Sequence, residues 1–177
     1  MPTMRLTPDS IGTASMGWTT NAANNLAAIS SDDGTTSSGS SYINSNGNTS
    51  LLEIGFSNPS IAEGDISSIT SVQWCSVGRC TARGSGGTDV VITFHTPSGF
   101  EETINFFNNR NYEVECGTAR TAKPDSSAWS YSDLEGLKLN LNHPSGEPQM
   151  RMAFLYIDVV YVAVAARDNA TFFGTNF

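Results

Sequence analysis

The sequence predicts an all-β fold, a two-sheet antiparallel jelly-roll β-sandwich, from three observations. Charged residues make up only 15% of the 177-residue chain, while Ser, Thr, Asn and Gly separate short apolar runs, as is typical of strands and turns. About seven or eight strand-like segments follow at short spacing, without the alternation of strand and helix that builds a parallel sheet. A chain of this length commonly folds as one sandwich domain.

The chain divides into three predicted parts. Residues 1–17 contain prolines and glycines without periodicity, which predicts an extended N-terminal arm that is either disordered or ordered by a partner. The sandwich is expected over residues 18–166, although residues 18–50 are rich in Asn, Ser, Thr, Gly and Ala and taken alone resemble a linker. Residues 167–177 form the predicted C-terminal aromatic tail.

The strand signals become clear from residue 51 onward. The strand-like segments are SLLEIGF, ISSITSVQWCSVGRCTAR, DVVITFHT, FEETINFFN, NYEVEC, LKLNLN and MRMAFLYIDVVYVAVAA. Residues 88–108 are expected to form a hairpin around the turn PSG. In the second segment the apolar positions change face between Ile66 and Val72, which indicates a bulge or a strand break. The last segment is apolar on both faces, so it is expected in the middle of a packed sheet.

Charge and hydropathy argue against nucleic-acid and membrane partners. The formal net charge is -8, and the nine Lys and Arg residues are scattered singly, whereas phosphate binding needs clustered cations. The longest apolar run, AFLYIDVVYVAVAA, is too short to span a bilayer and contains Asp158. No signal-peptide pattern is visible at the start of the sequence. We therefore expect a soluble protein that is made in a cytoplasm.

The sequence offers no pattern that predicts catalysis or a cofactor. The G-x-S-x-G turn of a serine nucleophile is absent, and His95 and His143 are expected to be ordinary surface or rim residues. Glu101 and Glu102 are neighbours on a strand, so they point to opposite faces and cannot form a glycosidase pair. The RGSGGTD segment lacks the lysine and the following helix of a phosphate-binding loop. We expect a protein that is not an enzyme.

Three aspartates are candidate ligands for calcium, because hard cations bind carboxylate and carbonyl oxygens. Asp32 and Asp33 lie in the polar segment SSDDGTTSS, and Asp158 lies in an otherwise apolar strand. A buried carboxylate must be paired, hydrogen-bonded or bound to a metal. The favoured interpretation places Asp158 at a sheet edge or pairs it with an arginine such as Arg151.

The three cysteines, Cys75, Cys80 and Cys116, are an odd number and cannot form a complete disulfide framework. Their spacing does not match a zinc ribbon. The favoured interpretation is small, half-buried side chains on strands, and the alternatives are a Cys75–Cys80 disulfide or a metal site.

The segment KPDSSAWSYSDLEGLKLNL predicts a Pro-Asp turn, a short acidic turn capped by Ser130, and a strand whose leucines enter the core. Exposed Trp or Tyr rings are the stacking platforms of sugar-binding proteins. Trp129 and Tyr131 are therefore a candidate glycan platform. The core is the favoured position for all three tryptophans, Trp18, Trp74 and Trp129.

Several of these pieces follow one another in a familiar order: Trp18, SSDDGTTSSGSSYI, ISSITSVQW, KPDSSAWSYSDLEGLKL and FLYIDVVYV. This order, over residues 18–162, resembles the small jelly-roll structural proteins of tailed bacteriophages. Proteins of this kind serve as capsid cement or decoration proteins and as tail-fibre or baseplate modules.

The resemblance, together with the small size and extended ends of the chain, implies a capsid cement protein. Such a protein is made in the host cytoplasm, lies on the capsid surface of the virion and bridges neighbouring major capsid protein subunits. A homotrimer is also implied. The expected partner contacts lie in the arm and the tail, at Arg5, Leu6, Phe172, Phe173 and Phe177. The alternative is a carbohydrate-binding module of a tail fibre or baseplate that recognises host surface glycans.

Overall fold

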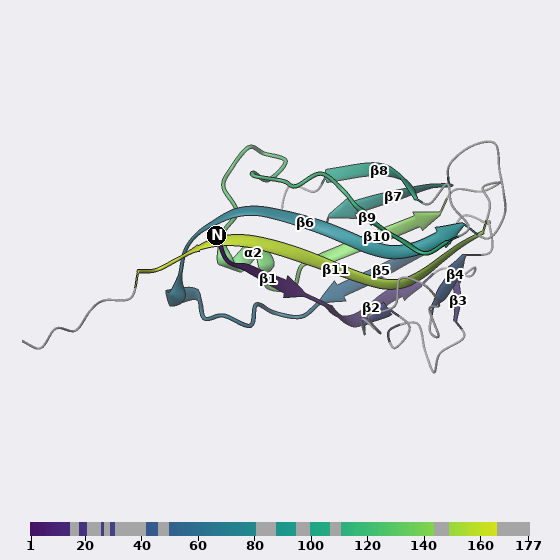
Figure 1. The fold of residues 1–177 in the computed structure, drawn as a ribbon, viewed down its shortest axis with the longest axis horizontal. Helices are drawn as coiled ribbons and strands as arrows, with labels where there is room; N and C mark the ends of the chain where they lie inside the picture. The colour runs from purple at the N-terminus through teal and green to yellow at the C-terminus, as the bar shows by residue number, and fades with distance from the viewer. Residues whose placement is uncertain are drawn as a thin grey trace, which may run out of the picture.

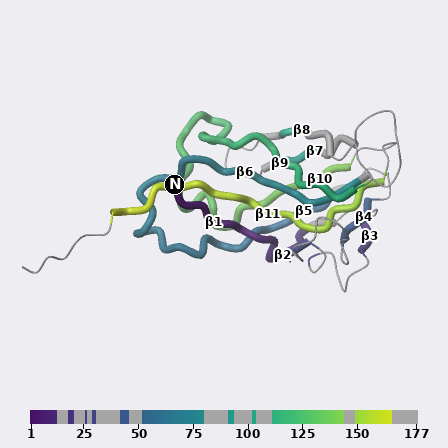
Figure 2. Tube along the Cα trace, viewed as in Figure 1, coloured from purple at the N-terminus to yellow at the C-terminus, as the bar shows by residue number. Residues whose placement is uncertain are grey.

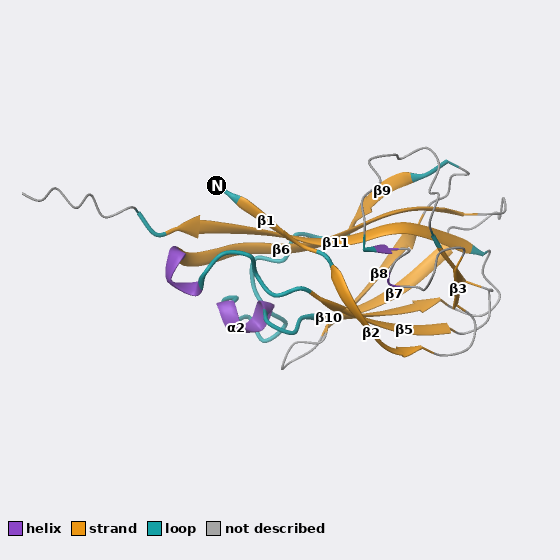
Figure 3. Ribbon diagram, turned by 90° about the horizontal axis from the view of Figure 1, so that it is seen from below, coloured by secondary structure: helices purple, strands orange, loops and turns teal. Residues whose placement is uncertain are grey.

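The structure is a computed structural model that describes residues 1–14, 18–20, 26, 29–30, 42–45, 50–80, 88–94, 100–106, 111–143 and 149–165. These residues form two antiparallel β-sheets in two layers (Figure 1 and Figure 3). The six-stranded sheet contains β1 (Thr3–Leu6), β3 (Trp18–Thr20), β4 (Ile43–Ser45), β6 (Ile66–Cys80), β9 (Glu113–Cys116) and β11 (Met150–Ala163). The five-stranded sheet contains β2 (Pro8–Ala14), β5 (Ser50–Phe56), β7 (Thr88–Phe94), β8 (Phe100–Phe106) and β10 (Lys138–His143). The predicted all-β sandwich is confirmed.

The order of the strands is that of a jelly roll. One sheet runs β3-β4-β11-β6-β9, and the other runs β2-β5-β10-β7-β8. If β4 to β11 are taken as a set of eight strands, the first, eighth, third and sixth form one sheet, and the second, seventh, fourth and fifth form the other. Two interleaved Greek keys give this arrangement. The predicted hairpin is also confirmed, because β7 and β8 pair antiparallel from Thr88–Phe106 to Phe94–Phe100.

The long strand β11 lies in the middle of its sheet, as its apolar sequence predicts. It pairs with β6 along one side, and with β4 and then β1 along the other. The predicted change of face in β6 is a bulge. Ser71 pairs with Val160 and Ile69 pairs with Tyr161, so Thr70 is an additional residue in β6.

The main core lies between the sheets and includes Trp18, Trp74 and Trp129, all of which are at most 8% exposed. Gly117 lies so close to Trp74 that a Cβ atom at this position would overlap the indole ring. A second, smaller cluster covers the outer face of the six-stranded sheet, and its members are Cys75, Val77, Tyr112, Ala153, Phe154 and Tyr156. β11 is therefore buried on both faces.

The N-terminal segment is extended, but it needs no partner chain to order it. Strand β1 pairs with β11 in one sheet, and β2 pairs with β5 in the other. Figure 2 shows the purple first strand beside the yellow last strand. Met4 and Leu6 are 5% and 1% exposed, so the prediction of Leu6 as a partner contact is wrong. Phe172, Phe173 and Phe177 lie outside the described residues.

Two short helical segments are described along their whole length. A 3₁₀ turn covers Glu63–Asp65, and α2 covers Tyr131–Leu134. Strands β6 and β11 continue past the five-stranded sheet, and α2 lies at this end of the sandwich (Figure 1 and Figure 3). In the described part of the chain, no helix is long and apolar enough to cross a membrane.

Candidate functional site

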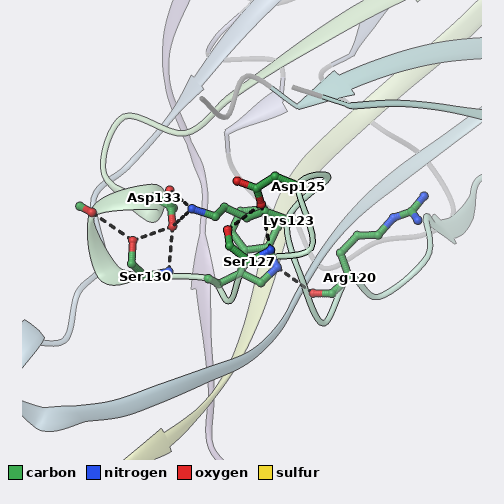
Figure 4. A network of polar contacts seen from close by, with 8 residues as sticks. Arg120, Lys123, Asp125, Ser127, Ser130 and Asp133 are labelled. Carbon is green, nitrogen blue, oxygen red and sulfur yellow. Dashed lines mark hydrogen bonds and ion pairs between the residues drawn. The ribbon is translucent and has the colours of Figure 1, made fainter. Parts of the chain in front are cut away.

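The loop between β9 and β10, residues 117–137, contains Trp129 and Tyr131, the predicted glycan platform. Figure 4 shows the polar contacts of this loop. The loop is fixed to the six-stranded sheet by a bridge between Arg120 and Val72, whose backbone groups exchange hydrogen bonds of 2.8 and 3.0 Å. The side chain of Trp129 is buried, with only 4% of the residue exposed, and its Nε1 donates to the carbonyl oxygen of Arg120 at 2.9 Å. The hydroxyl of Tyr131 donates to the carbonyl oxygen of Ile61 at 2.9 Å. The favoured position of Trp129 in the core is confirmed, and its candidate role as a surface platform is wrong, because the ring anchors the loop to the core.

Asp133 organises the polar side of this loop. Its Oδ2 accepts hydrogen bonds from the backbone N–H of Ser130 at 2.8 Å and from the Ser130 hydroxyl at 2.6 Å. The ammonium group of Lys123 lies 3.1 Å away, and the two charged side chains are only 15% and 6% exposed. Burial acts to raise the pKa of Asp133, but the hydrogen bonds from Ser130 and the charge of Lys123 outweigh it and hold the pKa below its ordinary value. Ser130 is the N-cap residue of α2, as predicted.

A second ion pair attaches the beginning of the loop to β8. Arg120 lies 3.0 Å from Oε2 of Glu102, and the other carboxylate oxygen of Glu102 accepts hydrogen bonds from the N–H and hydroxyl of Thr118. Burial acts to raise the pKa of Glu102, and the hydrogen bonds from Thr118 and Arg120 together lower it below its ordinary value. The charged groups of this loop therefore connect parts of the scaffold.

Asp158, a predicted metal candidate, forms an ion pair instead. Its two carboxylate oxygens accept hydrogen bonds from Nε and Nη2 of Arg5 at 2.8 and 3.1 Å. The guanidinium of Arg5 also lies 3.7 Å from the ring centroid of Tyr156. The expected arginine partner is present, but it is Arg5 and not Arg151. Asp158 and Arg5 thus satisfy each other, and neither the metal role nor a partner role for Arg5 is needed to explain them.

No group of three or more His, Cys, Asp and Glu side chains within the described ranges could hold a metal ion. Asp32 and Asp33 lie outside these ranges, and so does His95. His143 ends β10 and is fully buried, which contradicts its expected position on the surface or rim.

The cysteines were predicted wrongly. Cys75 of β6 and Cys116 of β9 are register partners with Cα atoms 4.1 Å apart, and a disulfide joins them. The favoured interpretation of free thiols is therefore incorrect for this pair, and the alternative Cys75–Cys80 disulfide is excluded. The sequence places both residues on strands, but it does not reveal that these strands are neighbours.

A polar row crosses the outer face of the six-stranded sheet, and the sequence did not reveal it. Arg151 of β11 is in register with Asn44 of β4 on one side and with Arg79 of β6 on the other. We call these three residues the arginine row. The Arg151 guanidinium lies 4.4 Å from the ring centroid of Tyr42, and that of Arg79 lies 5.0 Å from the ring centroid of Tyr112.

The opposite end of this sheet carries exposed apolar side chains. Met1, Val162 and Val164 are 80%, 40% and 47% exposed. They lie together because Tyr161 donates a backbone hydrogen bond to Pro2, and because the start of β1 pairs with the end of β11. We call these three residues the apolar end.

No protein family and no curated protein matches this sequence. Among solved structures, the fold is similar to the Agl-KA catalytic domain, with a TM-score of 0.43 and 15% sequence identity. The similarity covers 96% of this chain and 30% of that one, so this chain spans less than a third of its length. A similarity this low carries no argument about function.

Proposed function

We propose that this chain is a non-enzymatic structural protein of a phage virion, a cement or decoration protein that binds the outer surface of the head. It bridges neighbouring major capsid protein subunits and acts as a homotrimer. The order of sequence motifs described above supports this family. The observation that carries the proposal is the apolar end, because exposed apolar patches mark surfaces that bind other proteins.

The apolar end has the properties of a docking surface. In the described part of the chain, four large apolar residues are exposed, and three of them, Met1, Val162 and Val164, gather here. The sequence after β11 also contains Phe172, Phe173 and Phe177, which lie outside the described residues. Complete burial of a fully exposed valine side chain contributes about 1.5–3 kcal/mol, and Val162 and Val164, which are 40% and 47% exposed, can each contribute a part of this. Many copies that bind only the assembled shell then stabilise that shell by mass action.

The test is binding of the purified chain to phage heads that lack it, measured as copies bound per head at increasing protein concentration. The Val162→Asp, Val164→Asp double variant should bind at least about tenfold more weakly, because each change places a charge in an apolar contact. Deletion of residues 168–177 should also weaken binding and leave the sandwich folded. The matched control is Val114→Asp, since Val114 is 48% exposed but lies on β9, away from this end.

Equal occupancy of the double variant and the Val114→Asp control would contradict this docking surface. Failure of the unmodified chain to bind any head, together with retention on immobilised host polysaccharide, would contradict the cement function and support the carbohydrate-binding alternative.

A further inference from the structure

The arginine row is a feature of the molecule that the proposed docking surface does not use. Met150 and Met152 of β11 are fully buried in the core between the sheets. Successive side chains on a strand point to opposite faces, so Arg151 points to the outer face. Its register partners Asn44 and Arg79 point to the same face. The row lies near the β4 end of the sheet, far from the N-terminus (Figure 1 and Figure 2).

The row places two positive charges next to each other on the sheet face. Like charges directly opposite each other in an antiparallel pair destabilise it, and Arg79 and Arg151 are such a pair. Asp158 lies seven residues further along β11 and is paired with Arg5. Among the residues that the structure describes, Arg151 has no carboxylate partner. A negative charge placed beside Arg151 would therefore be stabilised.

Two polar atoms in this row lack hydrogen bonds within the described residues. The Nε atom of Arg151 and the Oδ1 atom of Asn44 are buried, and neither has a hydrogen-bond partner. Buried polar atoms are nearly always paired in folded proteins. One of these atoms is a donor on a cation and the other is an acceptor, so an anion with a donor group beside it would satisfy both.

The tyrosines orient the guanidinium groups for such a ligand. A guanidinium that stacks on a ring directs its N–H groups outward in its own plane, where they can bind both oxygens of a carboxylate. Burial raises the pKa of Tyr112 above its ordinary value, although the charges of Arg79 and Arg151 act against it. The hydroxyl of Tyr112 therefore stays protonated at neutral pH and remains a hydrogen-bond donor.

We propose that the arginine row binds a carboxylate that carries a neighbouring hydroxyl group, which is the chemistry of a small hydroxy acid or of a uronic acid sugar. Arg151 binds the carboxylate, with Arg79 beside it, and Asn44 accepts a hydrogen bond from the ligand hydroxyl. This site is independent of the apolar end, so a head-binding experiment and a ligand-binding experiment can fail separately.

The experiment is an NMR titration of the ¹⁵N-labelled chain that follows the side-chain N–H signals of Arg151 and Asn44. Four probes are used at constant ionic strength: glycolate, glucuronate, acetate and glucose. Glycolate and glucuronate should shift both signals, acetate should bind more weakly because it lacks the hydroxyl, and glucose should not bind. Binding of glucuronate at least about tenfold tighter than glycolate would identify a sugar as the source of the carboxylate.

Variants show whether the probes bind at the arginine row or respond only to the loss or gain of positive charge anywhere on the sheet. Arg151→Gln should weaken binding of glycolate and glucuronate at least about tenfold, since it removes a charge-assisted hydrogen-bond pair. Arg5→Gln is the matched control, because Arg5 lies on the same sheet but is paired with Asp158, and it should bind as the unmodified chain does. Asn44→Ala should remove the preference for glycolate over acetate.

The backbone amide spectrum of Arg151→Gln shows whether this variant is folded. If it is not, Arg151→Lys keeps the charge and should still bind at least about tenfold more weakly, because an ammonium cannot form the bidentate contact. The proposal is overturned if the charged probes shift neither side-chain signal, if folded Arg151→Gln binds as tightly as the unmodified chain, or if Arg5→Gln loses as much affinity.

Discussion

The loop of residues 117–137 and the arginine row contain similar residue types but use them differently. Both combine basic side chains with aromatic rings and short polar groups. In the loop, Lys123 is paired with Asp133 and the indole N–H of Trp129 is bonded to a backbone carbonyl. Among the described residues of the row, the Nε atom of Arg151 and the Oδ1 atom of Asn44 are buried without a hydrogen bond. The loop has such an atom too, the Nε of Arg120, but Arg120 forms an ion pair with Glu102, whereas Arg151 has no carboxylate partner within the described residues. The two regions therefore differ in the pairing of their charges and not in their residue types.

The difference follows from how the two regions are assembled. The loop is local in sequence, and partners such as Ser130 and Asp133 are three residues apart. The row combines residues of β4, β6 and β11, and strand register alone brings them together. A local loop can satisfy its polar groups with near neighbours, while a row on a sheet face has only the positions that the register supplies.

The largest expected effect tests the structural role of the loop. Trp129→Ala should lower the free energy of unfolding by about 3–5 kcal/mol, because it leaves a large cavity in the core. Urea denaturation followed by far-UV circular dichroism measures it. Tyr131→Phe, which removes one hydroxyl hydrogen bond, should cost about 1 kcal/mol. If Trp129→Ala cost no more than Tyr131→Phe, the ring would not be a core anchor, and the comparison with the row would fail.

A smaller effect is expected where the two regions meet, at the disulfide between Cys75 and Cys116. It joins the outer face of the sheet to the residue that precedes the loop, and it spans a sequence separation of 41 residues. The Cys75→Ala, Cys116→Ala double variant should be less stable by about 2–4 kcal/mol, chiefly because its unfolded chain is less constrained.

Urea denaturation with and without dithiothreitol measures the effect of the disulfide. The reductant should destabilise the unmodified chain by a similar amount and leave the double variant unchanged. An unmodified chain with the same stability in both conditions would show that the disulfide does not form in solution.

Periodicity predicted most of the sandwich, because alternation of apolar residues is a local property. It identified the bulge at Thr70 and the central position of β11, since both follow from which face each side chain occupies. Periodicity did not predict the strands within residues 3–14, because their prolines suggested an extended arm. Pro8 is the first residue of an edge strand, where a missing N–H is tolerated. The alternation of buried residues at Met4 and Leu6 is the sequence pattern that could have predicted β1.

The candidate site could be predicted less well than the fold. The pairing of Asp158 with an arginine follows from the cost of a buried charge, but the choice of Arg5 over Arg151 depends on β1 lying beside β11. The Cys75–Cys116 disulfide and the arginine row depend on register in the same way. Register is set by the whole sheet, so no single segment of the sequence contains it.

The smallest of these effects concerns Asp133 and depends on pH. Its pKa is lowered in the folded chain, so its ionised form stabilises the fold. This contribution is fully present above the ordinary aspartate pKa of about 3.9 and is lost as the pH falls through the lowered pKa. Asp133→Asn should therefore cost about 1–2 kcal/mol at neutral pH, because it breaks the pair with Lys123 and the bonds from Ser130.

The control for Asp133 is Asp125→Asn in the same loop, since Asp125 is exposed and accepts its hydrogen bonds among the described residues from its neighbour Ser127. This variant should change stability less than Asp133→Asn does. Urea denaturation near neutral pH and at a pH below the lowered pKa of Asp133 should show the difference between Asp133→Asn and the unmodified chain shrink in acid, because both then carry a neutral side chain. An equal difference at both pH values would mean that the charge of Asp133 does not organise the loop. The contrast between the paired charges of the loop and Arg151 of the row would then rest on the ion pair of Arg120 with Glu102.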